Sequence, residues 1–420
     1  MKILLRKVLI ADSTSSLNNL IKDILIENGK IVLIADSIPD KADEYIEETD
    51  CVVSPGWVDT FSHFCDPGYE YKETLETGAA SASAGGFTDV FVLPNTLPMV
   101  QSKSQVEYIV QKSKMLPVNI HPIGAITKNI EGKDLAEMYD MHASGAVAFS
   151  DGLFPVQTSG LLLKALQYVK AFEGILMQVP IDQSIGTHGL MNEGIVSTRL
   201  GLPGLPAIAE EIIVKRDIDL LRYTESKLHI TGISTSVSLE EIAKAKKEGI
   251  AISCSVTPYH LYFTDEDLLE YDTNLKVNPP LRSKNDRQAL REGILNGTID
   301  CIASHHLPQN WDNKTCEFEY AKAGMIGLES SFAIVNSVLP ELSNDQLVKI
   351  FSTTARTIFN LPAIIIEEGA DAELTLFSRR GLTLLTKENI KSKSHNSPFV
   401  QKELKGKVIG TITKGHIYLN

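Results

Sequence analysis

Histidine supplies most of the side chains in this sequence that could bind a metal or transfer a proton at neutral pH. The 420 residues include 10 histidines but only five cysteines, which are widely separated and form no CxxC pair. This cysteine pattern predicts neither a disulfide framework nor a thiolate zinc site. A metal or acid–base centre would therefore have to be built from imidazole and carboxylate groups.

Four positions are candidates for such a centre: His63, Asp151, His229 and His305. A single imidazole makes a poor zinc site, so a hydrogen-bonded pocket histidine is the interpretation we favour for His63. A ligand set drawn from all four positions is the alternative, and it requires close agreement of several ligand distances. Asp151 has a second interpretation as an ordinary loop or helix-cap carboxylate.

Two further residues beside these candidates could take part in chemistry. Cys65 could act as a nucleophile next to His63, but no orienting partner is recognisable, so we interpret it as a pocket thiol. His306 follows His305 directly at an expected strand end. The two imidazoles should then point to opposite faces, and at most one should face a barrel interior.

The overall composition predicts a protein with a large hydrophobic core and a negative net charge. Hydrophobic residues make up 43% of the chain, and 40 Lys and Arg against 53 Asp and Glu give a formal net charge of −13. This sign disfavours binding to the phosphate backbone of a nucleic acid. No run approaches the roughly 18 apolar residues of a membrane span, and the start has no convincing cleavage site. We expect a cytoplasmic protein with no nucleic-acid or membrane partner.

The middle of the sequence alternates short apolar runs with helical patterns, which is typical of a parallel α/β fold. About eight β/α units without a Gly-rich phosphate loop favour a (β/α)8 TIM barrel over an open sheet. In the predicted helix Ser238–Glu248, Ser238 stands three residues before Glu241, which predicts an N-cap at Ser238. The predicted strands are Gly56–Phe61, Thr88–Leu93, Val118–Ile126, Ala146–Phe149, Ile175–Val179, Leu228–Ile233, Ala251–Val256 and Asp300–Ala303. The other predicted helices are Glu107–Lys114, Leu161–Phe172, Ala207–Thr224 and Arg287–Leu295.

Both ends of the chain differ from the middle. Residues 1–55 and 366–420 show short strand patterns with polar turns, and together they predict one small β-sandwich domain built from both termini. Residues 56–365 then form the barrel domain. The polar segment Lys387–Val400 is predicted to be a mobile excursion within the terminal domain.

Ten short sequence runs lie between Ser54 and Phe377, and their order and spacing resemble those of a known protein family. They include SPGWVDTFSHFCDPGYEYKET, GGFTDVFVLPNTLP, AFSDGLFPV, KLHITGIST, VNPPLR and GTIDCIASHHLPQ. On these runs the chain resembles the bacterial-type dihydroorotases of the amidohydrolase superfamily. The resemblance implies a metal-dependent hydrolase barrel that opens a cyclic amide in pyrimidine biosynthesis, with one or two zinc-like ions activating water.

The resemblance also implies where the metal ligands should stand, and most of them are replaced. Of the family's first HxH pair only His63 is kept, because the other position is Phe61. A histidine is missing at Val179, and the second histidine of the HIxH run is Gly232. The Asp that serves as metal ligand and proton shuttle is His305. Asp151 matches an acidic position that binds metal in some bacterial relatives.

The groups that bind the substrate carboxylate are replaced as well. The family's Arg is Cys65, and a thiol cannot act as a bidentate anion clamp. The last histidine of the DHAPH run is Gln309. Asn95 and Asn278 stand at positions that line the family's substrate pocket, where they either bind a small molecule or satisfy turn backbone.

These losses predict a catalytically inactive dihydroorotase-like protein with no catalytic residue and no cofactor. Family members with degenerate metal sites assemble with aspartate transcarbamoylase, so the resemblance implies a structural or regulatory role with that partner, and we also expect a homo-oligomer. The alternative is an active cyclic-amide hydrolase, a dihydroorotase or related amidohydrolase, with zinc in a reduced or unusual site. Its candidate ligands are His63, Asp151 and His305.

Overall fold

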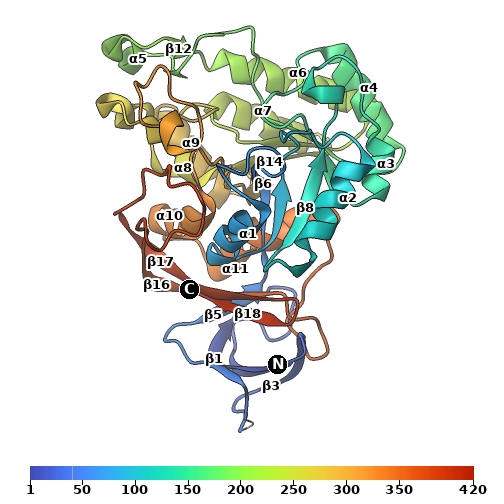
Figure 1. Ribbon diagram of the computed structural model, residues 1–420, viewed down its shortest axis with the longest axis vertical. Helices are drawn as coiled ribbons and strands as arrows, with labels where there is room; N and C mark the ends of the chain where they lie inside the picture. The colour runs from blue at the N-terminus through green and yellow to red at the C-terminus, as the bar shows by residue number, and fades with distance from the viewer. Residues whose placement is uncertain (40) are drawn as a thin grey trace.

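The larger part of the protein is a nearly closed barrel of eight parallel strands, shown by a computed structural model that describes residues 1–39 and 41–420 (Figure 1). The strands pair in the order β15-β14-β13-β10-β9-β8-β7-β6. A bridge between Ser62 and His306 joins the two ends of this order. The predicted TIM barrel is confirmed. Its strands are β6 Trp57–Ser62, β7 Phe87–Val92, β8 Asn119–Gly124, β9 Ala148–Phe149, β10 Leu176–Gln178, β13 Leu228–Thr231, β14 Ile252–Val256 and β15 Cys301–Ile302.

Helices cover the outside of the barrel (Figure 1). Every residue of β6, β7, β13 and β14 is buried, because side chains cover both faces of a parallel barrel strand. One apolar cluster joins the strands to the helices, and a second fills the inside of the barrel. The main helices are α1 Leu75–Ala84, α2 Lys103–Lys112, α4 Ser159–Lys170, α6 Ile208–Thr224, α7 Ser236–Lys247, α9 Lys284–Leu295 and α10 Ser331–Val338.

Helix α7 begins earlier than the sequence pattern indicates. Its N-cap is Thr235, whose hydroxyl accepts a hydrogen bond from the Ser238 backbone N–H at 3.2 Å. The predicted N-cap at Ser238 is wrong, because Ser238 lies in the first turn and its hydroxyl accepts from Thr235. The buried Glu210 carboxylate accepts the Thr235 backbone N–H at 3.0 Å, which fixes the start of the helix.

A second sheet combines the two ends of the chain, as Figure 1 shows at the bottom of the view. β5 from the N-terminal part pairs with both β1 and β16, so the two ends share one core. The expected small β domain from both termini is present, and its strands form a single order β18-β17-β16-β5-β1-β2-β3, with β4 beside β1. The strands are β1 Lys2–Ile10, β2 Ile21–Glu27, β3 Lys30–Ala35, β4 Glu44–Ile46, β5 Val52–Pro55, β16 Leu374–Leu384, β17 Glu403–Thr413 and β18 His416–Leu419.

The segment Lys387–Val400 connects β16 to β17 and is anchored to the barrel. The Asn396 side chain donates to the carbonyls of Leu307 and Gly324, both at 3.1 Å, and accepts the Gln309 backbone N–H at 3.0 Å. The expected mobile excursion is therefore wrong, because the polar side chains that suggested it bind loop backbone. None of the helices in the described parts of the chain is both long and apolar enough to cross a membrane.

Candidate functional site

The candidate residues gather at one end of the barrel because each follows the carboxyl end of a strand. Phe61 lies at the end of β6, with His63 and Cys65 directly after it. Gly232 follows β13, and His305 follows β15 by three residues. The barrel thus brings together positions that are far apart in the sequence.

Three of the replaced positions pack directly against one another. The rings of Phe61 and His305 are stacked, with centroids 4.2 Å apart and an interplanar angle of 27°. A Cβ atom placed on Gly232 would lie 2.5 Å from Cε1 of His305. The imidazole therefore occupies the space that any side chain at position 232 would need.

His305 is held in place as a neutral imidazole. Its Nε2 is 2.8 Å from the Thr231 hydroxyl, which in turn accepts a hydrogen bond from the Ser255 hydroxyl at 2.9 Å. Burial lowers the pKa of His305 to about 3. At neutral pH this side chain is an uncharged packing group with one ring nitrogen already bound.

Both ring nitrogens of His63 have partners within the protein. Nδ1 accepts the Cys65 backbone N–H at 3.0 Å, so the ring hydrogen lies on Nε2 and is donated to the Asn95 carbonyl at 3.0 Å. Burial lowers the pKa of His63 to about 4. The side chain therefore fits the pocket-histidine interpretation better than that of a metal ligand.

Cys65 lies 2.9 Å from Nδ1 of His63 through its Sγ atom, yet its surroundings do not activate it. The residue is almost completely buried, and burial raises the pKa of its thiol far above the usual range. A nucleophilic cysteine needs thiolate character and access to substrate. The geometry supports a pocket thiol.

Asp151 ties two barrel loops together. Its carboxylate accepts the backbone N–H groups of Ile126 and Thr127, both at 2.9 Å, and also the Thr127 hydroxyl. Burial raises the pKa of Asp151 to about 6 despite these hydrogen bonds. Its oxygens are committed to the turn that follows β8.

The two asparagines predicted to line the pocket have different surroundings. Asn95 donates to the Asp151 carbonyl at 3.1 Å and accepts the Leu153 backbone N–H at 3.1 Å, so its amide satisfies turn backbone. Asn278 is exposed at the barrel mouth. It borders both a cavity of about 20 Å³ beside His305 and a more open hollow of about 430 Å³.

The remaining replaced positions are also filled or bound. Val179 belongs to the apolar cluster inside the barrel, together with Phe61. The Gln309 side chain donates to the Ala323 carbonyl at 3.0 Å. Neither position places a charged group in the mouth.

A zinc site needs several imidazole or carboxylate ligands converging on an open position. Within residues 1–39 and 41–420, no three His, Cys, Asp or Glu side chains are grouped to hold a metal ion. His229, the fourth candidate ligand, has its ring nitrogens 2.8 and 3.0 Å from the hydroxyls of Ser253 and Ser255. The residues present therefore do not fit the metal centre that the resemblance implies.

His306 has different partners from His305, but strand alternation is not the reason, because β15 ends at Ile302 and His305 has a φ of +45°. Its Nε2 lies 3.3 Å from the Glu73 carboxylate, and its Nδ1 accepts the Gly327 backbone N–H at 3.3 Å. Glu73 also accepts from the Ser392 hydroxyl and the Lys393 backbone N–H. Although burial opposes ionisation, hydrogen bonds from His306 and Ser392 hold the pKa of Glu73 below its usual range. Sequence reasoning missed Glu73, because no local pattern marks a buried carboxylate in a loop.

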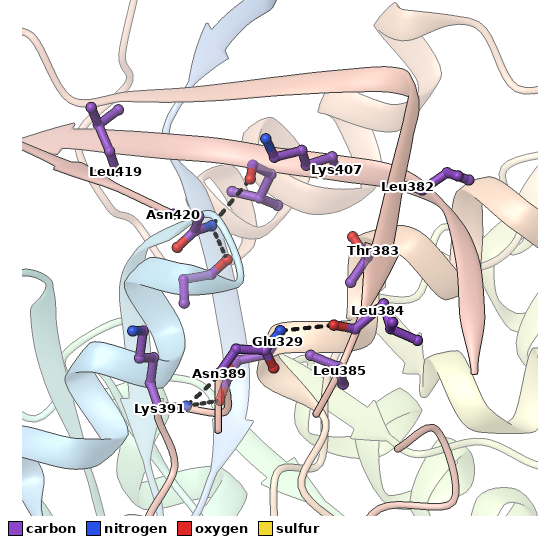
Figure 2. Close-up of a pocket in the computed structure, with 12 residues that line it drawn as sticks. Glu329, Leu382, Thr383, Leu384, Leu385, Asn389, Lys391, Lys407, Leu419 and Asn420 are labelled. Carbon is purple, nitrogen blue, oxygen red and sulfur yellow. Dashed lines mark hydrogen bonds between the residues drawn. The ribbon is translucent and has the colours of Figure 1, made fainter. Parts of the chain in front are cut away.

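A second crevice lies away from the mouth, between the β16–β17 hairpin and the end of α1 (Figure 2). Its volume is about 280 Å³, and several leucines line it. Glu329 accepts the Lys391 backbone N–H at 3.0 Å, and the Asn420 side chain donates to the carbonyls of Ala84 and Val408. The hydrogen bonds drawn in Figure 2 thus join the walls of the crevice to one another.

Comparison with known proteins gives consistent relationships. A profile of the family described as Dihydro-orotase-like matches residues 50–238. A protein named Dihydroorotase from Syntrophus aciditrophicus is 38% identical over 99% of this chain and 99% of its own length. Another, from Acetivibrio thermocellus, is 40% identical over 95% of each chain. The solved L-hydantoinase (dihydropyrimidinase) from Arthrobacter aurescens has a TM-score of 0.87 at 22% identity and covers 100% of this chain and 96% of that one.

The barrel, its terminal sheet and the strand-end positions define an amidohydrolase-type fold. At 22% identity the L-hydantoinase shows the fold alone. The two relatives that match along nearly the full length show the family: the chain belongs to the dihydroorotase family.

Proposed function

We propose that this chain is a non-catalytic member of the dihydroorotase family that acts as a structural or regulatory partner of aspartate transcarbamoylase. The observation that carries the proposal is the packing of Phe61, Gly232 and His305. The stacked rings fill the centre where the family places its metal ligands, and the cavity beside them is about 20 Å³. A space of this size holds about one water molecule and no ring-shaped substrate.

Substrate anchoring supports the same proposal. The family holds the substrate carboxylate with an Arg at the position of Cys65, whose buried thiol carries no positive charge. Removing one partner of a buried charge pair typically costs about 2–5 kcal/mol of binding. A substrate bound in the family's manner would lose this anchor as well as its metal.

The experiment is a direct assay of dihydroorotate hydrolysis by the purified full chain with added zinc, together with its zinc content. The dihydroorotase from Acetivibrio thermocellus, purified in the same way, is the positive control. We expect no hydrolysis above the buffer rate and much less than one zinc per chain. Hydrolysis comparable to the control would overturn the proposal. The proposed partnership needs a separate measurement. The purified chain is mixed with the aspartate transcarbamoylase of the same organism, and the mass of any assembly that forms is determined.

A second candidate function is an active cyclic-amide hydrolase, a dihydroorotase or related amidohydrolase with an unusual zinc site. The names of the relatives favour it, since proteins named Dihydroorotase match this chain along nearly its whole length. His63, Asp151 and His305 would be its candidate ligands, although each is now hydrogen-bonded to protein groups. The same assay separates the two functions.

A further inference from the structure

Large apolar side chains are exposed along one rim of the barrel, beside the mouth. Ile195 is 87% exposed, Trp311 74% and Tyr320 70%. Single exposed apolar residues are ordinary, but a group of them with aromatic members indicates an interaction surface. We call this group the aromatic rim, and it consists of Ile195, Leu269, Tyr271, Trp311 and Tyr320.

The segments that carry the aromatic rim lie against one another. Helix α5 (Ile195–Leu200) packs on the 3-10 helix η3 (Asp265–Glu270), and the Tyr271 hydroxyl donates to the Leu200 carbonyl at 2.8 Å. The Thr273 hydroxyl donates to the Lys314 carbonyl at 2.7 Å, which joins this part to the loop that contains Trp311. The aromatic rim is therefore drawn from three separate parts of the sequence, each of which is hydrogen-bonded or packed against the next.

Two lysines within this surface turn their amines inward. Lys276 donates through Nζ to the carbonyls of Phe318 and Glu319 at 2.7 and 2.9 Å, and Lys314 donates through Nζ to the Thr273 carbonyl at 2.8 Å. Both side chains are buried, so their charges do not face solvent.

Carboxylates dominate the exposed charge of the same segments. The exposed basic residues are fewer: Arg199 on α5, Lys322, and Lys284, whose ammonium lies 2.7 Å from the Glu266 carboxylate. The aromatic rim thus combines apolar anchors with negative charge. Its exposed acidic residues are Glu266, Asp267, Glu270, Asp312, Glu317 and Glu319.

We propose that the aromatic rim is the docking surface for a partner protein that presents arginine and lysine side chains around an apolar patch. Charge complementarity decides the occupant, because like charges placed opposite one another oppose binding. A second copy of this chain would bring its own carboxylates to the same place, and a nucleic acid would bring phosphates. The inference deepens the proposed partnership and rests on it, since it says where the partner binds.

The experiment uses the full chain and the aspartate transcarbamoylase of the same organism, with the dissociation constant measured by sedimentation. We expect Trp311→Ser combined with Tyr320→Ser to weaken binding about tenfold or more, because aromatic anchors dominate interface energy. We expect Glu317→Lys combined with Glu319→Lys to weaken it as well and to reduce its sensitivity to salt. The matched controls are Tyr223→Ser, with a tyrosine also 74% exposed but on α6, and Glu240→Lys on α7.

Each outcome of this experiment tests a different part of the proposal. Loss of binding in the rim variants but not in the controls supports the docking surface. If the wild-type chain assembles and the rim variants bind as tightly as it does, the surface assignment is overturned while the partnership stands. If the wild-type chain does not assemble at all, the partner clause of the proposed function is wrong, and this assignment is wrong with it. If the chain alone forms dimers that Trp311→Ser dissociates, the occupant is a second copy and the basic partner is overturned.

Discussion

The imidazole of His305 lies directly over Gly232, so closely that a Cβ atom at position 232 would come within 2.5 Å of Cε1. Gly232 also has a φ of +73°, in the left-handed region that favours glycine. Two separate effects therefore oppose a side chain there: backbone strain and a clash with a buried ring.

The two effects can be separated by mutation. We expect Gly232→Ala to lower the free energy of unfolding by about 2–4 kcal/mol, from strain together with overpacking. Gly249→Ala is the matched control, because Gly249 has a φ of +80° but nothing within 4 Å of its added Cβ. Gly249→Ala should lower the free energy of unfolding, measured by urea denaturation, by only about 1 kcal/mol. Equal losses at the two sites would mean that the His305 contact costs nothing.

The buried His305 should make stability depend on pH. Its pKa is about 3 in the folded chain, whereas an unfolded histidine titrates near 6.5. The unfolded state binds more protons between these values, so this contribution is complete above about pH 6.5 and is lost as the pH falls.

His305→Gln removes this titration and should make the pH dependence of unfolding less steep, while other buried histidines such as His63 keep theirs. Below about pH 6 the stability gap between the wild type and the variant should shrink by up to about 1.4 kcal/mol per pH unit. Urea denaturation from pH 5 to 7.5 measures it. Parallel curves for the wild type and His305→Gln would contradict the prediction.

Asp151 should tolerate an amide but not truncation. Asp151→Asn keeps a carbonyl oxygen for the backbone N–H groups of Ile126 and Thr127, and burial already disfavours the charged form. Asp151→Ala leaves those donors without an acceptor and should cost about 1–3 kcal/mol. Thermal and urea unfolding of both variants provide the comparison. Similar losses in the two variants would show that the charge of Asp151 matters more than its hydrogen bonds.

Asn396 should control how tightly the β16–β17 connection is held. Asn396→Ala removes its bonds to the carbonyls of Leu307 and Gly324, and local opening should become easier. We expect limited proteolysis between residues 386 and 400 to become about tenfold faster or more. Asn389→Ala is the control, because Asn389 bonds only within the same turn region. Unchanged cleavage in Asn396→Ala would place the anchor elsewhere, for example at Glu73.

The sequence predicts the barrel well because buried parallel strands leave a strong local signal. Every predicted strand from Gly56–Phe61 to Asp300–Ala303 overlaps an observed strand. The start of α7 at Thr235 depends on the distant Glu210, and the anchoring of Lys387–Val400 depends on Asn396 meeting loops of the barrel. Contacts between distant residues of this kind leave no periodic pattern, so local reasoning misses them.

The candidate site, too, could be predicted only in part from the sequence. Family-like runs identify the positions that matter, such as Phe61 and His305. The residue types alone do not reveal that these two rings stack, or that the glycine at 232 makes room for the imidazole. The buried Glu73 beneath His306 has no recognisable motif, because its role comes from the segment that folds over it.

The stacked rings also restrict how the chain could change over generations. A histidine at position 232 meets the imidazole of His305, and an aspartate at position 305 leaves Phe61 facing a buried charge without a partner. Each single step toward the family's usual residues is thus less stable than the present arrangement. The side chains at positions 61, 232 and 305 are therefore coupled, and a change at one of them requires compensating changes at the others.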